Sequence, residues 1–380
     1  MARLLLHALS CAALTLAATG ARAAPSFTTL YNFQGGTDGA MPASRLVADR
    51  HFNLYGTTNQ TGGDTNFGTI YKLAPGGTES VLHLFSGGND GAQPEEGLLL
   101  DKKGNLNGGT GGAGKTGLGT LYKLTRLDKL SVLYSFPRKV EVDAPNGDLI
   151  ADGAGNLFGT AGGGGASVGV IFELTPSKIL SVLHEFQGAD GADPFSGLIT
   201  DASGTMYGTT LQGGTSNIGV LYSLTPSGTY SVLHNFSGFP HDGANPADAP
   251  VLDAEGNFYG VTETGGKVGL GTVYKLAPGG TETILHNFKG MPDGNEPAGR
   301  LVMDASGNLY GVTSGGGSAN LGMVFKVAPS GKLTVLHNFS GGADGLGPAA
   351  GLLADAHGNY YGTTLLGGAN NLGTIFKIRP

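Results

Sequence analysis

The chain has 380 residues and a formal net charge of −7 at pH 7, so it lacks the basic surface that a nucleic-acid partner requires. Glycine accounts for 70 residues, well above the usual ~7%, and Cys11 is the only cysteine, which excludes a fold stapled by disulfides.

The N-terminal segment predicts a secretory signal peptide. Arg3 precedes an apolar run from Leu4 to Ala18, and Ala21-Arg22-Ala23 has the small-x-small pattern of a cleavage site. The run is too short to span a bilayer, and no later stretch of the sequence is long and apolar enough to do so. We therefore expect residues 1–23 to be removed and residues 24–380 to form one exported domain that is secreted, periplasmic or at the cell surface.

The remaining chain consists of seven copies of a unit of about fifty residues. One proline marks the same loop in every copy: Pro42, Pro94, Pro145, Pro194, Pro246, Pro297 and Pro348. Each copy contains four β-rich runs, A to D, and none has a helical period. In the fourth copy we expect strands at Leu198–Asp201, Met206–Thr210, Val220–Leu224 and Tyr230–Phe236. Because propellers use four-stranded blades, the sequence predicts an all-β, seven-bladed β-propeller.

The two chain ends favour a closed ring. The mature chain begins with a D-type run, Phe27–Phe33, and ends after a C-type run, Gly373–Ile378. The last copy lacks the very strand that the N-terminus carries, so we expect the N-terminal strand to complete the last blade. The alternative is an open β-solenoid. Its two ends do not meet, so placing the missing strand at the N-terminus would bring it no stabilisation, and it would need capping repeats.

The repeat resembles a known family. The patterns Asp-x-x-Gly-Asn-Leu-Tyr-Gly-Thr-Thr and Gly-Thr-Val-Tyr-Lys-Leu look like the GloVer tandem repeat of bacterial "choice-of-anchor" surface proteins, in all seven units between residues 27 and 380. The resemblance implies an exported repeat protein and does not define an activity. Part of the pattern is also similar to NHL-type propeller blades.

One position in run D is aromatic or imidazole in every copy. It holds His83, His184, His234, His286 and His337, with Tyr31 and Tyr134 in the other two copies. Metal ligation does not tolerate a free exchange of histidine for tyrosine. We therefore interpret this as a packing position with a polar tip.

An acidic residue stands four positions before each loop proline. The set is Asp38, Asp90, Glu141, Asp190, Asp242, Asp293 and Asp344. Asp-Gly is a strong turn signal, so turn formation explains the set. The alternative is a ring of carboxylates on the loop face that binds a polyol or a hard cation such as Ca²⁺. We expect no other cofactor.

Positions that differ between copies are the better candidates for a ligand site. Just after the loop proline, some copies carry charges where others have small residues: Arg45, Glu96, Asp148, Asp248 and Arg300. Run A is the innermost strand of a blade, so these side chains are expected around the mouth of the central channel. Converging charges at a concave mouth predict a polar ligand site. The alternative is a set of solvated or mutually paired charges at strand ends.

The sequence thus favours an exported, monomeric binding or scaffold propeller that holds a glycan or a partner protein at its loop face. Propellers also host enzymes, so an envelope lyase or hydrolase is the rival class. A third possibility is a purely structural spacer, which mutual salt bridges between the charged residues would favour.

Overall fold

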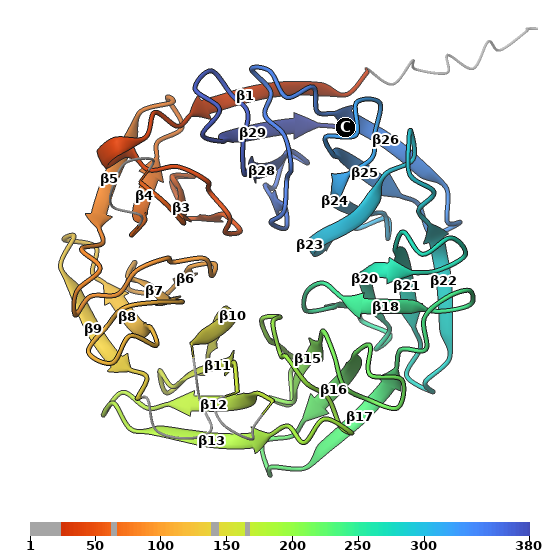
Figure 1. The fold of residues 1–380 in the computed structure, drawn as a ribbon, viewed down its shortest axis with the longest axis horizontal. Helices are drawn as coiled ribbons and strands as arrows, with labels where there is room; N and C mark the ends of the chain where they lie inside the picture. Colours follow the sequence, from red (N-terminus) through yellow and green to blue (C-terminus); the bar gives the residue numbers. More distant parts are fainter. Residues whose placement is uncertain (1–23, 62–66, 138–143, 164–167) are drawn as a thin grey trace, which may run out of the picture.

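The computed structural model describes residues 24–61, 67–137, 144–163 and 168–380, and shows a closed ring of seven β-sheets (Figure 1). The predicted seven-bladed propeller is therefore confirmed. Residues 1–23, which carry the predicted signal peptide, lie outside the described residues, as does Glu141. Among the described residues, the helical content is one 3-10 turn, η1 (Gly36–Asp38), and no helix is long and apolar enough to cross a membrane.

In blades 1 to 6 the strands follow one another in chain order from the ring axis to the rim (Figure 1). Blade 1 contains β2 (Val47–Ala48), β3 (Leu54–Thr58), β4 (Thr69–Leu73) and β5 (Glu79–Leu84). Blade 2 contains β6 (Leu99–Leu100), β7 (Leu106–Thr110), β8 (Thr120–Leu124) and β9 (Leu130–Ser135). Blade 3 contains β10 (Pro145–Ala151), β11 (Leu157–Ala161), β12 (Val170–Leu174) and β13 (Leu180–Glu185). Blade 4 contains β14 (Ile199–Thr200), β15 (Met206–Thr210), β16 (Val220–Leu224) and β17 (Tyr230–Asn235).

The remaining blades vary this plan slightly. Blade 5 contains β18 (Gly243–Pro246), β19 (Val251–Leu252), β20 (Phe258–Gly265), β21 (Thr272–Leu276) and β22 (Glu282–Asn287). Blade 6 contains β23 (Asn295–Met303), β24 (Leu309–Gly315), β25 (Met323–Val327) and β26 (Leu333–Asn338). Blade 7 contains β27 (Leu353–Ala354), β28 (Tyr360–Thr364), β29 (Thr374–Arg379) and β1 (Ser26–Asn32).

The innermost strands are less regular than the sequence predicts. In blade 4 the two middle strands match their predicted bounds, but the first strand is paired only at Ile199–Thr200. A serine hydroxyl interrupts the ladder here, because Ser196 Oγ accepts the hydrogen bond of Thr209 N at 3.1 Å. Ser44 Oγ accepts from Thr57 N in the same way in blade 1, at 3.0 Å. A side-chain oxygen thus replaces a backbone carbonyl where the strand bends.

The N-terminal strand closes the ring as predicted. Strand β1 pairs with β29 in antiparallel register from Ser26↔Arg379 to Asn32↔Thr374. The first strand of the chain therefore forms the outer strand of the last blade, and the open solenoid is excluded. Closure also covers the outer edge of β29, which an open array would leave available for pairing with another chain.

Neighbouring blades are joined by a repeated aromatic contact. A buried phenylalanine directly after each outermost strand packs edge-on against an aromatic ring in the third strand of the next blade. The pairs are Phe33–Tyr71, Phe85–Tyr122, Phe136–Phe172, Phe186–Tyr222, Phe236–Tyr274, Phe288–Phe325 and Phe339–Phe376. Edge-to-face pairs contribute about 0.5–1.5 kcal/mol each beyond the area they bury. This set of contacts explains why the repeat keeps a phenylalanine at this place.

The loop proline that marks each copy is also a contact between blades. Gly373 has a φ of 97°, and a Cβ added to it would collide with the ring of Pro42. Glycine is needed here for both the positive φ and the close approach. This contact joins blade 7 to blade 1, and it repeats around the ring, for example between Gly219 and Pro246.

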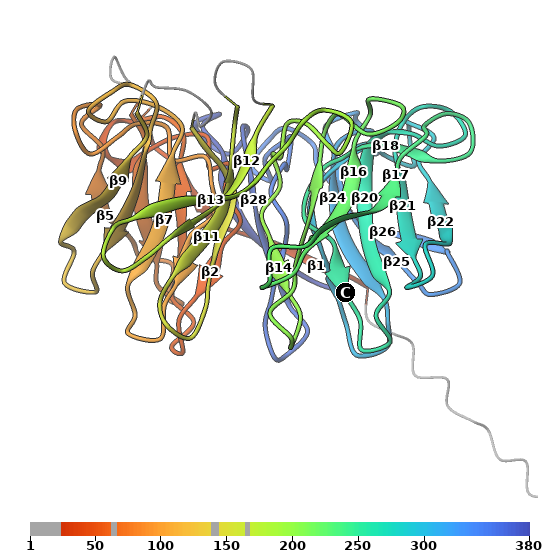
Figure 2. The ribbon, with the colours of Figure 1, turned by 90° about the horizontal axis from the view of Figure 1, so that it is seen from below.

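The two faces of the ring differ (Figure 2). Because each blade is an antiparallel meander, the A–B and C–D turns lie on one face, which is called the turn face below. The D–A and B–C loops lie on the other, which is called the loop face. The innermost strands β10 and β23 face the ring axis (Figure 1).

Candidate functional site

The five unit-specific charged residues all lie on the innermost segments of their blades. Asp148 is in β10 and Arg300 is in β23, whereas Arg45 and Glu96 precede the innermost strands of blades 1 and 2. Asp248 lies between the two innermost strands of blade 5, β18 and β19. All five residues are half-buried. We refer to these five residues as the axial charge cluster.

One ion pair in the cluster spans two blade boundaries. Arg45 Nε lies 3.2 Å from Asp148 Oδ2, although the two residues belong to blades 1 and 3. The other carboxylate oxygen, Asp148 Oδ1, accepts a hydrogen bond of 2.8 Å from Gly97 N in blade 2. A Cβ on Gly97 would collide with this carboxylate. The glycine of blade 2 thus makes room for the contact between its two neighbours.

Arg300 is the second guanidinium of the cluster. Burial lowers its pKa and so does the positive charge of Arg45, whereas Asp248 and Asp148 act in the opposite direction. Within the part of the chain that the structure describes, no carboxylate lies within the 4.0 Å ion-pair distance of Arg300. The charge of Arg45 thus acts on Arg300, and of these two arginines Arg45 alone has an ion-pair partner among the described residues.

The carboxyl groups of the cluster differ in acidity. Burial raises the pKa of Glu96 to about 8, with Asp148 and Glu95 adding to the effect. Burial and Asp148 raise the pKa of Asp248 to about 6, although Arg300 opposes the shift. At neutral pH Glu96 is therefore mostly protonated and can donate a hydrogen bond, whereas Asp248 is mostly ionised and accepts. The cluster thus offers guanidinium donors, one carboxylic acid and carboxylate acceptors.

The acids of the D–A loops each contact their own blade. Asp90, Asp190, Asp242, Asp293 and Asp344 lie 2.9–3.2 Å from the imidazole Nε2 of the run-D histidine, and Asp38 accepts a hydrogen bond of 2.8 Å from the hydroxyl of Tyr31. Each also accepts a backbone N–H at the start of its loop. These contacts fit the turn interpretation and give each described carboxylate a partner without a cation. Calcium binding by this set stays a prediction.

The histidine rings also pack as the sequence predicts. His83 packs edge-on against Phe85 at 4.8 Å, and the other four histidines repeat this contact with the phenylalanine two positions later. The imidazole thus has an apolar neighbour on one side and a carboxylate at its Nε2.

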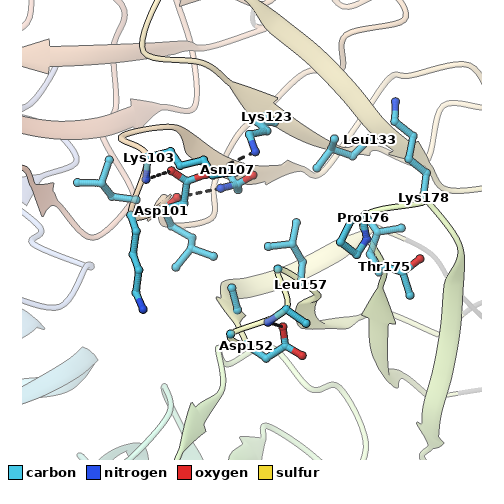
Figure 3. Close-up of a pocket in the computed structure, with 18 residues that line it drawn as sticks. Asp101, Lys103, Asn107, Lys123, Leu133, Asp152, Leu157, Thr175, Pro176 and Lys178 are labelled. Carbon is cyan, nitrogen blue, oxygen red and sulfur yellow. Dashed lines mark hydrogen bonds and ion pairs between the residues drawn. The ribbon is translucent and has the colours of Figure 1, made fainter.

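The turn face contains a cleft that the sequence did not predict. It lies between blades 2 and 3, has a volume of about 550 Å³, and is lined by Asp101, Asn107, Lys123 and Leu157 among others (Figure 3). Lys123 Nζ lies 3.4 Å from Asp101 Oδ2. A similar cleft of about 730 Å³ between blades 4 and 5 has no lysine in its lining. The sequence feature that could have indicated this cleft is Asn107, because the other units have the larger tyrosine or phenylalanine at this position.

The repeat matches a known protein family. The sequence pattern of the Gloeobacter/Verrucomicrobia repeat matches residues 19–218 and 163–376, which together span almost the whole chain. The chain belongs to this repeat family. A search of curated proteins gives no match.

Solved structures show that the family shares its fold with distant proteins. The chain is similar to a protein assigned as a gluconolactonase, with a TM-score of 0.51, 13% identity, and coverage of 94% of this chain and 93% of that chain. It is also similar to the extracellular domain of a protein assigned to the hybrid two-component systems of B. thetaiotaomicron (TM-score 0.59, 14% identity, 94% of this chain and 41% of that chain). A third is PorZ, a surface component of the type-IX secretion system of Porphyromonas gingivalis (TM-score 0.52, 15% identity, 87% and 46%). At these identities the likeness shows the fold alone.

Proposed function

We propose that this propeller is an exported binding protein whose axial charge cluster holds an acidic carbohydrate. The observation that supports the proposal is the pair of guanidinium groups. Arg45 and Arg300 repel each other, and Arg300 has no carboxylate at ion-pair distance among the described residues. An anionic group placed beside Arg300 offsets that repulsion. It can also accept two parallel hydrogen bonds from the planar guanidinium group.

The rest of the cluster suits the hydroxyl groups of a sugar. Asp148 and Asp248 accept hydrogen bonds, and Glu96 is protonated near neutral pH and donates one. A saccharide unit that carries one carboxylate or sulfate and several hydroxyls matches this mixture. Uronic acids and sulfated sugars are therefore the preferred ligand class.

An exported location agrees with this ligand class. The predicted signal peptide directs the chain out of the cytoplasm. Two of the fold neighbours described above are an extracellular domain and a bacterial surface component. Acidic polysaccharides are polymers that a protein in such a location meets.

The test is a binding measurement with defined oligosaccharides. The purified mature protein is titrated with uronate-containing, sulfated and neutral oligosaccharides of equal length. Replacing Arg45 and Arg300 together by glycine, which other units carry at this position, should weaken binding of the acidic oligosaccharide at least tenfold, because each charge-assisted contact contributes roughly 1.5–3 kcal/mol.

A matched control removes two arginines elsewhere. Arg50 and Arg126 are exposed in turns of the turn face, so replacing both by alanine changes the net charge equally and leaves the cluster intact. This control should bind as the parent does. Equal loss in both double variants would mean that overall charge, not the cluster, governs binding.

An enzyme is the second candidate, and the difference between Glu96 and Asp248 favours it. Two carboxyl groups whose pKa values are shifted to about 8 and about 6 are suited to act as acid and base. The same oligosaccharides, incubated with the protein and analysed for shorter products, test this. Cleavage that Glu96→Gln abolishes would replace the binding function by a lyase or hydrolase activity.

A further inference from the structure

A group of three potential metal ligands lies near the rim of the ring, away from the axial charge cluster. His234 is in the outermost strand of blade 4, β17, and Asp242 is in the loop that follows it. Glu282 begins the outermost strand of blade 5, β22. One ligand atom from each residue lies within 4.8 Å of the other two. Blade packing alone brings these three side chains together, because they come from two separate sheets.

The group contains buried oxygen atoms that no hydrogen bond satisfies. Asp242 is only 5% exposed. Its Oδ2 accepts hydrogen bonds from Ser237 N at 2.7 Å and Ser237 Oγ at 3.0 Å, and lies 3.1 Å from His234 Nε2. Among the described residues no donor lies at hydrogen-bond distance from its Oδ1 or from the buried Oε1 of Glu282. Burial and the adjacent Asp242 carboxyl group raise the pKa of Glu282 to about 9, so a proton shared between the two carboxyl groups is the alternative to a cation. Two carboxyl groups in contact offer only acceptors when both are ionised, so a cation or a proton must lie between them.

We propose that His234, Asp242 and Glu282 bind a divalent transition-metal ion, with Zn²⁺ as the preferred ion. One imidazole nitrogen and two carboxylate oxygens are ligands that zinc accepts. The 3.1 Å between His234 Nε2 and Asp242 Oδ2 is a hydrogen-bond distance that the other His–Asp pairs share, and it is also compatible with the edge of a tetrahedral zinc site, about 3.3 Å for bonds of about 2.0 Å. Glu282 as a third ligand is what distinguishes this pair from the others. The imidazole also disfavours calcium, which takes oxygen ligands.

Glu282 is unusual for its position in the repeat. At the equivalent place, Tyr230 stacks on His184 with ring centroids 3.8 Å apart, and Phe27 stacks on His337 at 3.7 Å. Other blades place Leu130, Leu180 and Leu333 there. The usual neighbour of the histidine is thus an apolar side chain, which packing explains. A carboxyl group in its place has no such explanation, and it supplies the third ligand.

The boundary between blades 7 and 1 provides a natural comparison. Glu79 occupies the same position there and also has an unpartnered buried oxygen, Oε1. Its neighbours are Asp38 and Tyr31, whose hydroxyl donates a 2.8 Å hydrogen bond to Asp38 Oδ1. This boundary has two carboxyl groups without an imidazole. Comparing the two boundaries therefore separates the contribution of the histidine to metal binding from the contribution of the carboxyl pair.

The experiment measures metal binding by the intact mature protein. The protein is first dialysed against a chelator, and ZnCl₂, CoCl₂ or CaCl₂ is then titrated while bound metal and melting temperature are followed. One Zn²⁺ per chain is expected, with a rise in melting temperature and, for Co²⁺, a visible absorption band that reports the ligand set. Wild-type protein that binds no Zn²⁺ or Co²⁺ would show that a shared proton satisfies the two carboxyl groups.

Variants use residues that the repeat already tolerates. His234→Tyr introduces the tyrosine that blades 2 and 7 carry at this position. Glu282→Leu introduces the leucine that blades 2, 3 and 6 carry at the position of Glu282, so both variants should fold. Each should weaken Zn²⁺ binding at least tenfold and remove the Co²⁺ band. The matched controls His286→Tyr and Glu79→Leu should bind as the parent does. Unchanged binding in Glu282→Leu, or stabilisation by Ca²⁺ that His234→Tyr retains, would overturn the proposal.

Discussion

Phe33 packs edge-on against Tyr71, with ring centroids 5.1 Å apart, and so joins the outer strand of the last blade to the first blade. Phe33 directly follows β1, the strand that pairs with β29. Residues 24–33 therefore have two roles at the seam. They complete the sheet of blade 7, and they fill the aromatic contact between blades 7 and 1.

The first prediction concerns this seam. Deleting residues 24–33 should lower the melting temperature and promote aggregation, because it exposes the edge of β29 and leaves Tyr71 without its partner. Thermal unfolding and light scattering measure the two effects. Deletion of residues 24–25 alone, which precede β1, is the control and should change neither quantity. A truncated protein as stable as the parent would contradict closure by β1.

The seam was predictable from the sequence, and the charged contacts were not. Four-strand units in fixed phase specify which runs pair, so the order of strands and the pairing of Phe27–Phe33 with Gly373–Ile378 could be predicted. The break in the innermost ladder depends on a serine hydroxyl that replaces a backbone acceptor, as Ser196 does. Sequence spacing carries no information about such a replacement.

The same limit applies to the two candidate sites. The axial charge cluster was found because its residues depart from the repeat, but the partner of Arg45 lies two blades away. The histidine position was correctly interpreted as packing in general. The special case of His234 arises only from Glu282 in the neighbouring blade, and blade-to-blade contacts of this kind require the ring geometry.

The second prediction tests whether the Arg45–Asp148 pair is structural. A double-mutant cycle with Arg45→Gly and Asp148→Gly should give a coupling free energy of only about 0.2–1 kcal/mol, because both side chains are partly exposed. Chemical denaturation measures the four stabilities. The cycle of Arg300→Gly with Asp148→Gly is the control and should give a smaller coupling. A coupling above about 2 kcal/mol would favour the interpretation of the cluster as a structural spacer.

The third prediction is a pH dependence that originates at Glu96. Its pKa is raised from 4.5 to about 8 in the folded chain. The unfolded chain therefore releases this proton first, and the stabilisation present below pH 4.5 is lost as the pH rises toward 8. Glu96→Gln stays neutral throughout. The melting temperature of the parent minus that of Glu96→Gln should fall by on the order of a few degrees across this window. A difference that does not change with pH would show that Glu96 titrates normally.

The fourth prediction compares two tyrosines of blade 4. The hydroxyl of Tyr222 is buried and has no hydrogen-bond partner among the described residues, and blades 3, 6 and 7 carry phenylalanine at this position. Because an unpaired buried hydroxyl costs roughly 1–3 kcal/mol, Tyr222→Phe should keep or raise stability. The hydroxyl of Tyr207 donates a 2.9 Å hydrogen bond to Asp201, so Tyr207→Phe should lower stability by about 1 kcal/mol. Equal effects of the two substitutions on the free energy of unfolding would contradict this difference.

The last prediction concerns the cleft between blades 2 and 3. In five blades a tyrosine hydroxyl bonds the aspartate of the A–B turn at 2.9–3.1 Å, whereas blade 2 has Asn107 in that place. Lys123 Nζ contacts Asp101 Oδ2 instead, an oxygen that also accepts a hydrogen bond from Asn105 Nδ2.

Asn107→Tyr should restore the hydrogen bond to Asp101 and fill part of the cleft. Lys123 can keep its position beside the new ring. In blade 5 the equivalent lysine, Lys275, lies 5.5 Å from the ring centre of Tyr259. Within the described part of the chain, the side chain of Asn107 makes one hydrogen bond, of 3.4 Å to Leu99 O, so the substitution loses little. We expect a gain of about 1 kcal/mol in the free energy of unfolding. Asn107→Phe fills the same space without the hydroxyl, and the difference between the two variants measures the hydrogen bond. If both variants are less stable than the parent, the cleft does not admit an aromatic ring and Asn107 is needed for packing there.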